Sequence, residues 1–290
     1  MKIKLFAILF FCIIIYAIYF NEINEINEIN EIYVINLKNR PKRLIEFQNN
    51  YKLDRKFKVI DAIDGNNIND VDKLIGDEGK RSLDNYYKYN IKRKYHYELS
   101  SYGAIGCYLS HIYVWHDIIK NNDKNALIFE DDTNVYSTIK YDDIIKRLNS
   151  LPNDWDIYLL INPDYCYDKI KINNTNTNNT NNNTNNNTNN TNNTNTNNNT
   201  NNTNNIYKVK RFFLLHSYII NINACKKIIE NGKLYPINQQ IDHHLSELAL
   251  LGKINIYINS NLPYYNTIEN KSDIQINTSS DLSYERFILT

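Results

Sequence analysis

Three consecutive carboxylates, Glu130, Asp131 and Asp132, follow an apolar run at residues 126–129. Neighbouring negative charges repel one another, and a divalent cation that neutralises them would account for that cost. Glu130 and Asp132 have the spacing of a D-x-D pattern, and their hard oxygen ligands suit Mn²⁺ or Mg²⁺. We therefore expect a metal and a diphosphate at this cluster. The alternative is a solvated acidic turn that caps the following helix.

A second set of candidates for binding this ligand also follows apolar runs. Its members are Asn36, Arg40, Arg43, Asp61, Asp64 and Gly65. Arginine offers phosphate oxygens a planar fork of donors, aspartate accepts hydrogen bonds from a ribose or a base, and glycine permits a tight turn. We expect these residues and Asp131 to hold a nucleotide through its base, ribose and phosphates. The alternatives are ordinary solvation at a helix start and a plain Asp-Gly turn.

A third candidate, His111, lies in a helical pattern at residues 106–119. Cys107 is four residues before His111 and three before Ser110, so the three side chains share one helix face. That face fits either a donor pocket or packed core. The chain has no Ser-His-acid order of the hydrolase type.

These residues must be positioned by strands that alternate with helices. Short apolar or β-rich runs at residues 32–37, 57–61, 126–129 and 157–161 predict buried strands. Helical periodicity at residues 105–119 and 144–148, and a helix that starts at Pro41, separate them. The alternation predicts an α/β fold with a mostly parallel sheet. In such sheets ligands bind beyond the carboxyl ends of the strands, where the candidates above are placed.

Composition excludes several other classes of protein. The chain has 33 Lys+Arg and 32 Asp+Glu and a formal charge of +1, which disfavours a nucleic-acid partner. The four Cys residues have no CxxC or CxxH spacing, which argues against a structural zinc finger or a disulfide-stapled miniprotein.

The N-terminal residues predict a membrane anchor. Residues 5–20 carry no charge, follow Lys2 and Lys4, and approach the ~17–25 residues of a spanning helix. We expect residues 1–20 to form an uncleaved, single-pass type II anchor in the thin membrane of the ER or Golgi, with a luminal catalytic domain. A cleaved signal peptide is the alternative, although no A-x-A-like site follows the apolar run.

Low-complexity segments divide the remaining chain. The NEI repeat at residues 21–32 predicts a spacer, and residues 33–290 form one domain. An Asn/Thr tract at residues 173–205 interrupts this domain and is expected to be a disordered loop, because it cannot bury apolar surface. In a lumen, several Asn-x-Ser/Thr triplets in and after this tract would accept glycans.

Seven motifs then occur in order along the chain. They are YVINLKNRPKR (33–43), AIDG (62–65), GAIGCYLSHIYVW (103–115), ALIFEDD (126–132), WDIYLL (155–160), SYIININACKKII (217–229) and QQIDHHL (239–245). Together they resemble glycosyltransferase family 25, the group of lipooligosaccharide and procollagen galactosyltransferases. The resemblance extends from Tyr33 to about Tyr265.

The resemblance implies a GT-A-like nucleotide-sugar-binding fold and a divalent metal such as manganese. The implied reaction is inverting transfer of a hexose, galactose or glucose, from a UDP-sugar to a hydroxyl group of a glycan or a hydroxylysine-containing protein. Direct displacement at an anomeric carbon requires a base for the acceptor hydroxyl proton. The family's matching aspartate makes Asp242 the candidate for that base, although it could instead bind metal or acceptor. Of its neighbours His243 and His244, which point in different directions on a helix, at most one is expected to bind a metal.

One position departs from the family pattern. Where the family has Glu in a G-E-I-G-C stretch, this chain has Ala104. The alternative function is therefore a noncatalytic carbohydrate- or nucleotide-binding relative that keeps the fold. A metal-dependent phosphohydrolase is a more remote alternative, because it normally needs more metal-binding residues.

Overall fold

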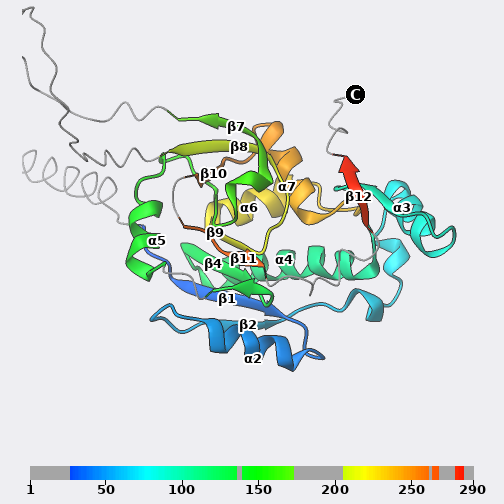
Figure 1. Cartoon of the computed structure of the whole chain (residues 1–290), viewed down its shortest axis with the longest axis horizontal. Coiled ribbons are helices and arrows are strands. Elements are labelled where there is room, and N and C mark those ends of the chain that lie inside the picture. The colour runs from blue at the N-terminus through cyan, green and yellow to red at the C-terminus, as the bar shows by residue number, and fades with distance from the viewer. Residues whose placement is uncertain (1–26, 136–138, 173–204, 261–262, 268–277, 284–290) are drawn as a thin grey trace, which may run out of the picture.

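A central sheet of eight strands organises the computed structural model of the chain (Figure 1). The structure describes residues 27–135, 139–172, 205–260, 263–267 and 278–283. The strands of the sheet are β1 (Glu31–Asn36), β2 (Lys58–Asp61), β4 (Asn125–Glu130), β6 (Ile157–Leu159), β7 (Cys166–Lys171), β8 (Ile206–Phe212), β9 (Ser217–Asn221) and β10 (Ile256–Asn259). Their spatial order is β2-β1-β4-β9-β6-β10-β8-β7.

Most strands of this sheet run in one direction. The pairs β1–β2, β1–β4 and β6–β10 are parallel, whereas β8 and β9 run antiparallel to their neighbours on both sides. The mostly parallel α/β sheet predicted from the sequence is therefore confirmed. The two reversed strands were not predicted.

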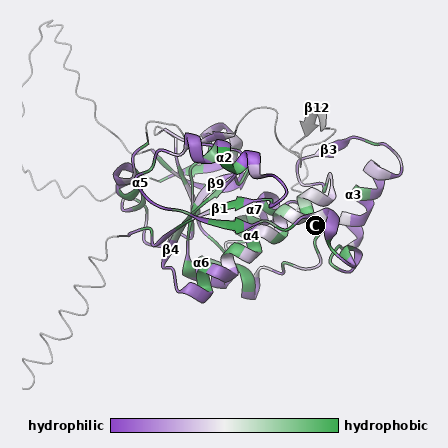
Figure 2. Cartoon of the chain, turned by 90° about the horizontal axis from the view of Figure 1, so that it is seen from below, coloured by the Kyte–Doolittle hydropathy of each residue, from purple (hydrophilic) through white to green (hydrophobic). Residues whose placement is uncertain are grey.

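Helices cover both faces of the sheet. Helices α4 (Tyr102–Asn121), α6 (Ile222–Asn231) and α7 (Ile241–Leu250) pack in one core, and α2 (Pro41–Asn50) and α5 (Tyr141–Leu148) pack in the other. In β1, Tyr33 and Ile35 join the first core, while Ile32 and Val34 join the second. Burial on both faces explains why β1 is continuously apolar rather than alternating. Accordingly, the central strands are largely green in Figure 2, and purple residues gather on outer helices such as α2.

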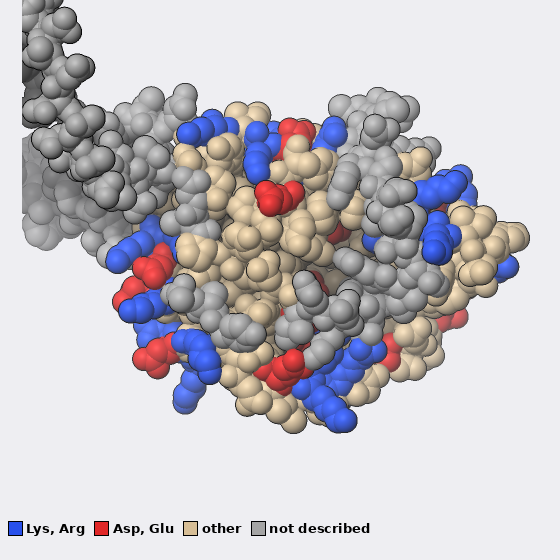
Figure 3. All heavy atoms as spheres, viewed as in Figure 1, with Lys and Arg blue, Asp and Glu red and all other residues tan. Residues whose placement is uncertain are grey.

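The four strands and three helices predicted from apolar runs and periodicity are all present as β1, β2, β4, β6, α2, α4 and α5. Pro41 occupies the first turn of α2, where its missing N–H costs no hydrogen bond. Beyond the sheet are α3 (Asp77–Tyr87) and two small strand pairs, β3 (Arg93–Tyr95) with β12 (Thr278–Ser283) and β5 (Thr133–Asn134) with β11 (Asn266–Thr267). On the face shown in Figure 3, the Lys/Arg and Asp/Glu side chains of the described residues are interspersed around the rim.

The end of the NEI repeat belongs to the folded domain. β1 begins at Glu31, Ile29 is buried, and the Asn30 N–H donates to the Asn125 carbonyl at 2.9 Å. The fold therefore starts a few residues before the predicted boundary at residue 33. The predicted anchor at residues 1–20 lies outside the described residues. Within the part of the chain that is described, no helix has the length and apolar character needed to cross a bilayer.

The Asn/Thr tract lies between two neighbouring strands, β7 and β8. These strands pair antiparallel, and the Ile172 N–H donates to the Ile206 carbonyl at 2.9 Å. The chain thus leaves and re-enters the sheet at adjacent positions. Residues 173–204 lie outside the described residues.

Candidate active site

Parallel pairing brings the ends of three strands together at one edge of the sheet. Asn36 at the end of β1 aligns with Asp61 at the end of β2, and Ile35 aligns with Glu130 at the end of β4. A cleft of about 260 Å³ opens at this edge. Its wall is formed by residues from segments 35–43, 62–66, 101–111 and 130–132, together with Tyr87 of α3. This is the position at which ligands bind in open α/β sheets.

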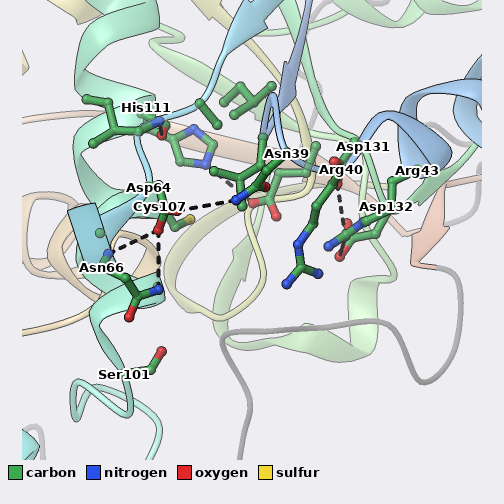
Figure 4. Close-up of a pocket in the computed structure, with 18 of the residues that line it drawn as sticks. Asn39, Arg40, Arg43, Asp64, Asn66, Ser101, Cys107, His111, Asp131 and Asp132 are labelled. Carbon is green, nitrogen blue, oxygen red and sulfur yellow. Dashed lines mark hydrogen bonds and ion pairs between the residues drawn. The ribbon is translucent and has the colours of Figure 1, made fainter. Parts of the chain in front are cut away.

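Glu130, Asp131 and Asp132 form an acidic turn on one wall of the cleft. Figure 4 labels Asp131 and Asp132 of this turn. Asn36 donates its side-chain N–H to Asp131 Oδ2 at 2.6 Å. Arg43 Nη2 lies 2.9 Å from Asp131 Oδ1 and 2.9 Å from Asp132 Oδ2. Arg43 therefore holds the two aspartates side by side, and Asn36 fixes the first of them. Both residues therefore stabilise the acidic turn. Arg43 also lines the cleft, and contact of either residue with a donor stays a prediction.

The three carboxyl groups of the acidic turn are only partly balanced by the positive charge of Arg43. Burial and the nearby charge of Glu130 raise the pKa of Asp132 to about 7, although Arg43 opposes this shift. Burial also raises the pKa of Asp131. Asp132 Oδ1 is buried and accepts no hydrogen bond. A buried carboxylate oxygen with no donor is expected to gain from a cation placed against it.

His111 reaches the acidic turn from α4 on the opposite wall. Its Nε2 lies 3.3 Å from Glu130 Oε1, and its Nδ1 lies 2.9 Å from the hydroxyl of Tyr218 in β9. Trp115 Nε1–H donates to the same hydroxyl at 3.0 Å. His111, Trp115 and Tyr218 are all buried. The imidazole is therefore fixed on both sides, and its hydrogen bond to Glu130 holds the pKa of that carboxylate below its ordinary value although burial opposes this.

Cys107, one helical turn before His111, also faces the cleft (Figure 4). Ligand atoms of Cys107, His111 and Glu130 all lie within 4.8 Å of one another. Among the described residues, this is the group of three His, Cys, Asp or Glu side chains whose ligand atoms lie close enough together to hold one metal ion. Asp132 is not part of this group. Of the two metal ligands expected from the sequence, the group therefore contains only Glu130.

The loop after β2 packs closely against the start of α4. A Cβ atom on Gly65 would lie 1.7 Å from the Tyr102 carbonyl oxygen, and one on Gly106 would lie 2.4 Å from the Ile63 carbonyl oxygen. Ser110 joins the same two segments, since its hydroxyl donates to the Gly106 carbonyl at 2.6 Å and accepts from the Ile63 N–H at 2.8 Å. Gly65 therefore permits close packing at the cleft wall, a stronger requirement than the tight turn expected from the sequence.

Asp64 and Asp61 have different surroundings. Asp64 caps a 3₁₀ turn at residues 65–67 and lines the cleft, but its carboxylate already accepts from the backbone and side chain of Asn66 and from the side chains of Asn39 and Asn67. Asp61 is exposed, lies 3.6 Å from Lys38, and is not among the residues that line the cleft. The structure thus leaves Asp61 outside the cleft wall.

Asp242 lies in the first turn of α7 and is not among the residues that form the cleft wall. Its Oδ2 accepts from the Leu214 N–H at 2.9 Å, and its Oδ1 accepts from the His243 N–H at 2.7 Å. Burial raises the pKa of Asp242 above its ordinary value, and the charge of Glu130 acts in the same direction. Asp242 is therefore close enough to Glu130 for their charges to interact.

The two histidines after Asp242 are used within the fold. His243 Nδ1 lies 2.6 Å from Gln239 Oε1, and His244 Nε2 lies 2.9 Å from the Gly232 carbonyl. Burial lowers the pKa of both, that of His243 to about 3. In the described part of the chain, neither histidine lines the cleft or belongs to a group of three potential metal ligands.

Sequence reasoning did not assign roles to Tyr218 and His216. Tyr218 lies in the SYIININ motif, but a tyrosine in an apolar strand has the pattern of an ordinary core residue. Trp115, in an apolar helix, has the same pattern. The His216 carbonyl accepts from the Glu130 N–H at 2.9 Å and from the Thr133 hydroxyl at 2.8 Å, and so fixes both ends of the acidic turn. Only the antiparallel pairing of β9 with β4 brings these residues to the site.

The site thus combines a cleft at a strand edge, an acidic turn and a buried histidine. The family model described as "Glycosyltransferase family 25 (LPS biosynthesis protein)" matches residues 29–245. The chain belongs to glycosyltransferase family 25, as the order of its motifs indicated.

Individual relatives match over shorter segments. The "Glycosyltransferase 25 family member" of Aedes aegypti is 34% identical over 116 residues, which are 40% of this chain and 17% of the relative. "Procollagen galactosyltransferase 1-A" of Xenopus laevis is 29% identical over 131 residues, or 44% of this chain and 20% of the relative. "Probable inactive glycosyltransferase 25 family member 3" of Rattus norvegicus is 26% identical over 144 residues, or 46% and 23%. The matches therefore span about a fifth of each of these relatives.

Proposed function

We propose that this chain is a metal-dependent glycosyltransferase with a GT-A-like fold. In this proposal it transfers a hexose, galactose or glucose, from a UDP-sugar to a hydroxyl group of a glycan or a hydroxylysine-containing protein. The observation that carries the proposal is the acidic turn at the sheet edge, where Asp132 Oδ1 is buried without a hydrogen-bond donor. The procollagen galactosyltransferase named among the relatives supports the choice of sugar and acceptor.

Asp132 and Glu130 would hold the metal, Mn²⁺ or Mg²⁺. The unsatisfied oxygen of Asp132, the raised pKa of its carboxyl and the hard oxygen ligands all fit such an ion. These metals often use only one or two protein carboxylates, with substrate phosphates completing the shell. When bound, the ion would neutralise the charge that develops on the leaving diphosphate.

The other residues of the cleft would position the donor. Arg40 lines the cleft next to the acidic turn, and its guanidinium is the cationic group that would meet the diphosphate (Figure 4). Arg43 and Asn36 keep Asp131 and Asp132 in place. His111 orients Glu130 through the 3.3 Å contact between them.

Asp242 would act as the base that accepts the proton of the acceptor hydroxyl. Its raised pKa makes the carboxylate a stronger base than an exposed aspartate, and the two backbone N–H groups hold it in one orientation. A single displacement with such a base inverts the configuration at the anomeric carbon.

The test is transfer by the full-length chain from a panel of UDP-sugars in the presence of Mn²⁺, with hydroxylysine peptides and glycans as acceptors. We expect turnover with one hexose donor, and we expect Asp132→Asn to abolish it. Asp61→Asn is the matched control, because it makes the same chemical change outside the cleft and is expected to retain turnover. Asp132→Asn with unchanged turnover across a Mn²⁺ titration would refute the assignment of the metal site.

The second candidate function is binding of a nucleotide sugar without catalysis. Ala104, where the family has Glu, is buried in the core and is not among the residues that line the cleft, so this position contributes no polar group there. One relative of this chain is named as probably inactive. Saturable binding of a UDP-sugar, with neither transfer nor slow donor hydrolysis, would favour this function over the first.

We also propose that residues 1–20 anchor the chain in the ER or Golgi membrane as a single-pass type II protein. The supporting observation is the uncharged run at residues 5–20 with Lys2 and Lys4 before it. The test is alkaline extraction of membranes followed by N-terminal sequencing. Retention in the membrane with Met1 intact is expected, whereas a mature N-terminus beyond residue 17 would indicate a cleaved signal.

A further inference from the structure

Helix α4 and the end of β4 bring together a sulfur, a nitrogen and a carboxylate at the cleft wall. Cys107 and His111 are four residues apart, so both face the cleft from adjacent turns of α4. Glu130 approaches them from the last position of β4. All three ligand atoms lie within 4.8 Å of one another. Two ligands four residues apart on a helix and a third from another element form a common plan for a zinc site.

The separation of two of the ligand atoms suits a tetrahedral ion. His111 Nε2 and Glu130 Oε1 are 3.3 Å apart. Two ligands at zinc bond lengths of about 2.0–2.1 Å in a tetrahedron are about 3.3 Å apart, so this pair already has the required separation. Cys107 is half-buried, and its sulfur lies within 4.8 Å of both of these atoms.

The partners of His111 also fit this role. A histidine that binds a metal through one ring nitrogen usually donates its other N–H to a neighbouring acceptor, which fixes the ring. Here the Tyr218 hydroxyl lies 2.9 Å from His111 Nδ1. A hydroxyl oxygen has two lone pairs, one for the Trp115 indole N–H and one for an N–H at Nδ1. With its proton on Nδ1, the ring has a lone pair on Nε2, which can bind a metal in place of its present hydrogen bond with Glu130.

We propose that Cys107, His111 and Glu130 form a binding site for a borderline-soft divalent cation of the Zn²⁺ type. The three side chains supply sulfur, nitrogen and oxygen ligands, and the fourth position opens into the cleft that all three residues line. The site binds the ion when the Cys107 thiol loses its proton to solvent and the resulting thiolate joins the metal. It differs from the proposed Mn²⁺ site at Asp132, whose ligands are carboxylate oxygens.

The two sites share Glu130, which links them. A carboxylate has two oxygens, so Glu130 can contact one ion at each site or be drawn fully to one of them. We expect Zn²⁺ bound beside His111 to compete for Glu130 with the ion at Asp132. This inference does not depend on which sugar is transferred, because it is tested by metal binding alone.

The test uses Co²⁺ as a spectroscopic substitute for Zn²⁺ in the full-length, tag-free chain. A thiolate that binds Co²⁺ gives a sulfur-to-metal charge-transfer band, which we expect to saturate at one ion per chain and to be displaced by Zn²⁺. Cys107→Ser should abolish this band. Cys166→Ser, the same change in a buried strand residue outside the cleft, and Asp132→Asn should both retain it. Retention in Asp132→Asn distinguishes this site from the proposed catalytic metal.

A second variant tests the supporting contact. Tyr218→Phe keeps all three ligands but removes the hydroxyl beside His111 Nδ1, and we expect Zn²⁺ affinity to fall roughly 10–100-fold. Zinc should also protect Cys107 of the unaltered chain from alkylation, as measured by mass spectrometry of the peptide that contains it. Absence of the charge-transfer band in the unaltered chain, its survival in Cys107→Ser, or alkylation of Cys107 at an unchanged rate in saturating Zn²⁺ would each overturn the proposal.

Discussion

Replacing Arg43 by methionine removes the cation that holds the acidic turn while keeping most of the side-chain volume. Arg43 Nη2 contacts Asp131 and Asp132 at 2.9 Å each. The exposed fractions of the three side chains are 16%, 9% and 10%. Arg43→Met therefore leaves two carboxylates with little access to water and without their shared partner. We expect the free energy of unfolding of the metal-free protein to fall.

The size of this loss follows from burial. Removing one member of a buried ion pair costs about 3–5 kcal/mol. The acidic turn borders an open cleft, where water reaches part of the uncovered charge, so we expect a loss of about 2–4 kcal/mol rather than the full amount. An exposed ion pair, in contrast, contributes only about 0–1 kcal/mol. The two cases are far enough apart to be distinguished by urea unfolding.

The assay compares urea unfolding of three proteins after metal has been removed with a chelator. Lys42→Met is the matched control, since it makes the same change of charge at an exposed position of α2 and should shift stability by no more than about 0.5 kcal/mol. Mn²⁺ at roughly a hundredfold excess over its dissociation constant stabilises a protein by about 2.7 kcal/mol. We expect Mn²⁺ to bind Arg43→Met more tightly than the unaltered chain and to recover most of the loss. Equal stability of Arg43→Met and Lys42→Met would refute the reasoning.

Three further predictions concern other parts of the molecule. Asp242→Asn should reduce transfer roughly 10²-fold or more with little change in UDP-sugar affinity, measured by initial rates and titration calorimetry, and parallel losses would instead assign Asp242 to donor binding. His243 has a folded-state pKa of about 3, below the ~6.5 of an unfolded histidine, so the unfolded chain binds more protons as pH falls through this range. When the pH is lowered from 7 to 5, the free energy of unfolding of the unaltered chain should therefore fall by about 2 kcal/mol more than that of His243→Asn. Equal falls in the two proteins would contradict this. Deleting residues 174–204 should leave activity and the thermal midpoint nearly unchanged, because β7 and β8 are already paired on either side and a shorter loop costs less to close; a lost fold would contradict it.

The sequence predicted the parallel half of the sheet well, for a physical reason. β1 and β4 are buried on both faces, so they appear in the sequence as continuous apolar runs ending in polar residues. β9 is equally apolar, but nothing in its sequence indicates that it pairs antiparallel with β4. Strand direction depends on tertiary packing, which periodicity does not record. Because the direction of β9 was not predicted, the contacts of His216 and Tyr218 with the site were not predicted either.

The structure gives the individual candidate residues different surroundings. Glu130, Asp132 and Arg40 line one cleft, because they follow the ends of the parallel neighbours β1 and β4, which meet at one edge of the sheet. Asp61 also ends a strand, but β2 is an edge strand of the sheet, and its last side chain is exposed. Arg43 fits a phosphate ligand equally well by residue type, yet it binds two aspartates of its own chain. Spacing along the sequence cannot distinguish a guanidinium that meets a substrate from one that neutralises a neighbouring turn.

Charge balance in the cleft connects the two proposed metal sites. The acidic turn carries three carboxylates, and Arg43 compensates for only part of their charge, so Asp132 is left with a buried oxygen that no donor reaches. Such an oxygen destabilises the metal-free fold and strengthens the attraction for a cation at the same time. His111 restrains Glu130 on the opposite side, and the Tyr218 hydroxyl restrains His111. Glu130 thus lies between the carboxylate of Asp132 and the sulfur and nitrogen of Cys107 and His111. We therefore expect a cation bound on one side to change how Glu130 is oriented toward the other.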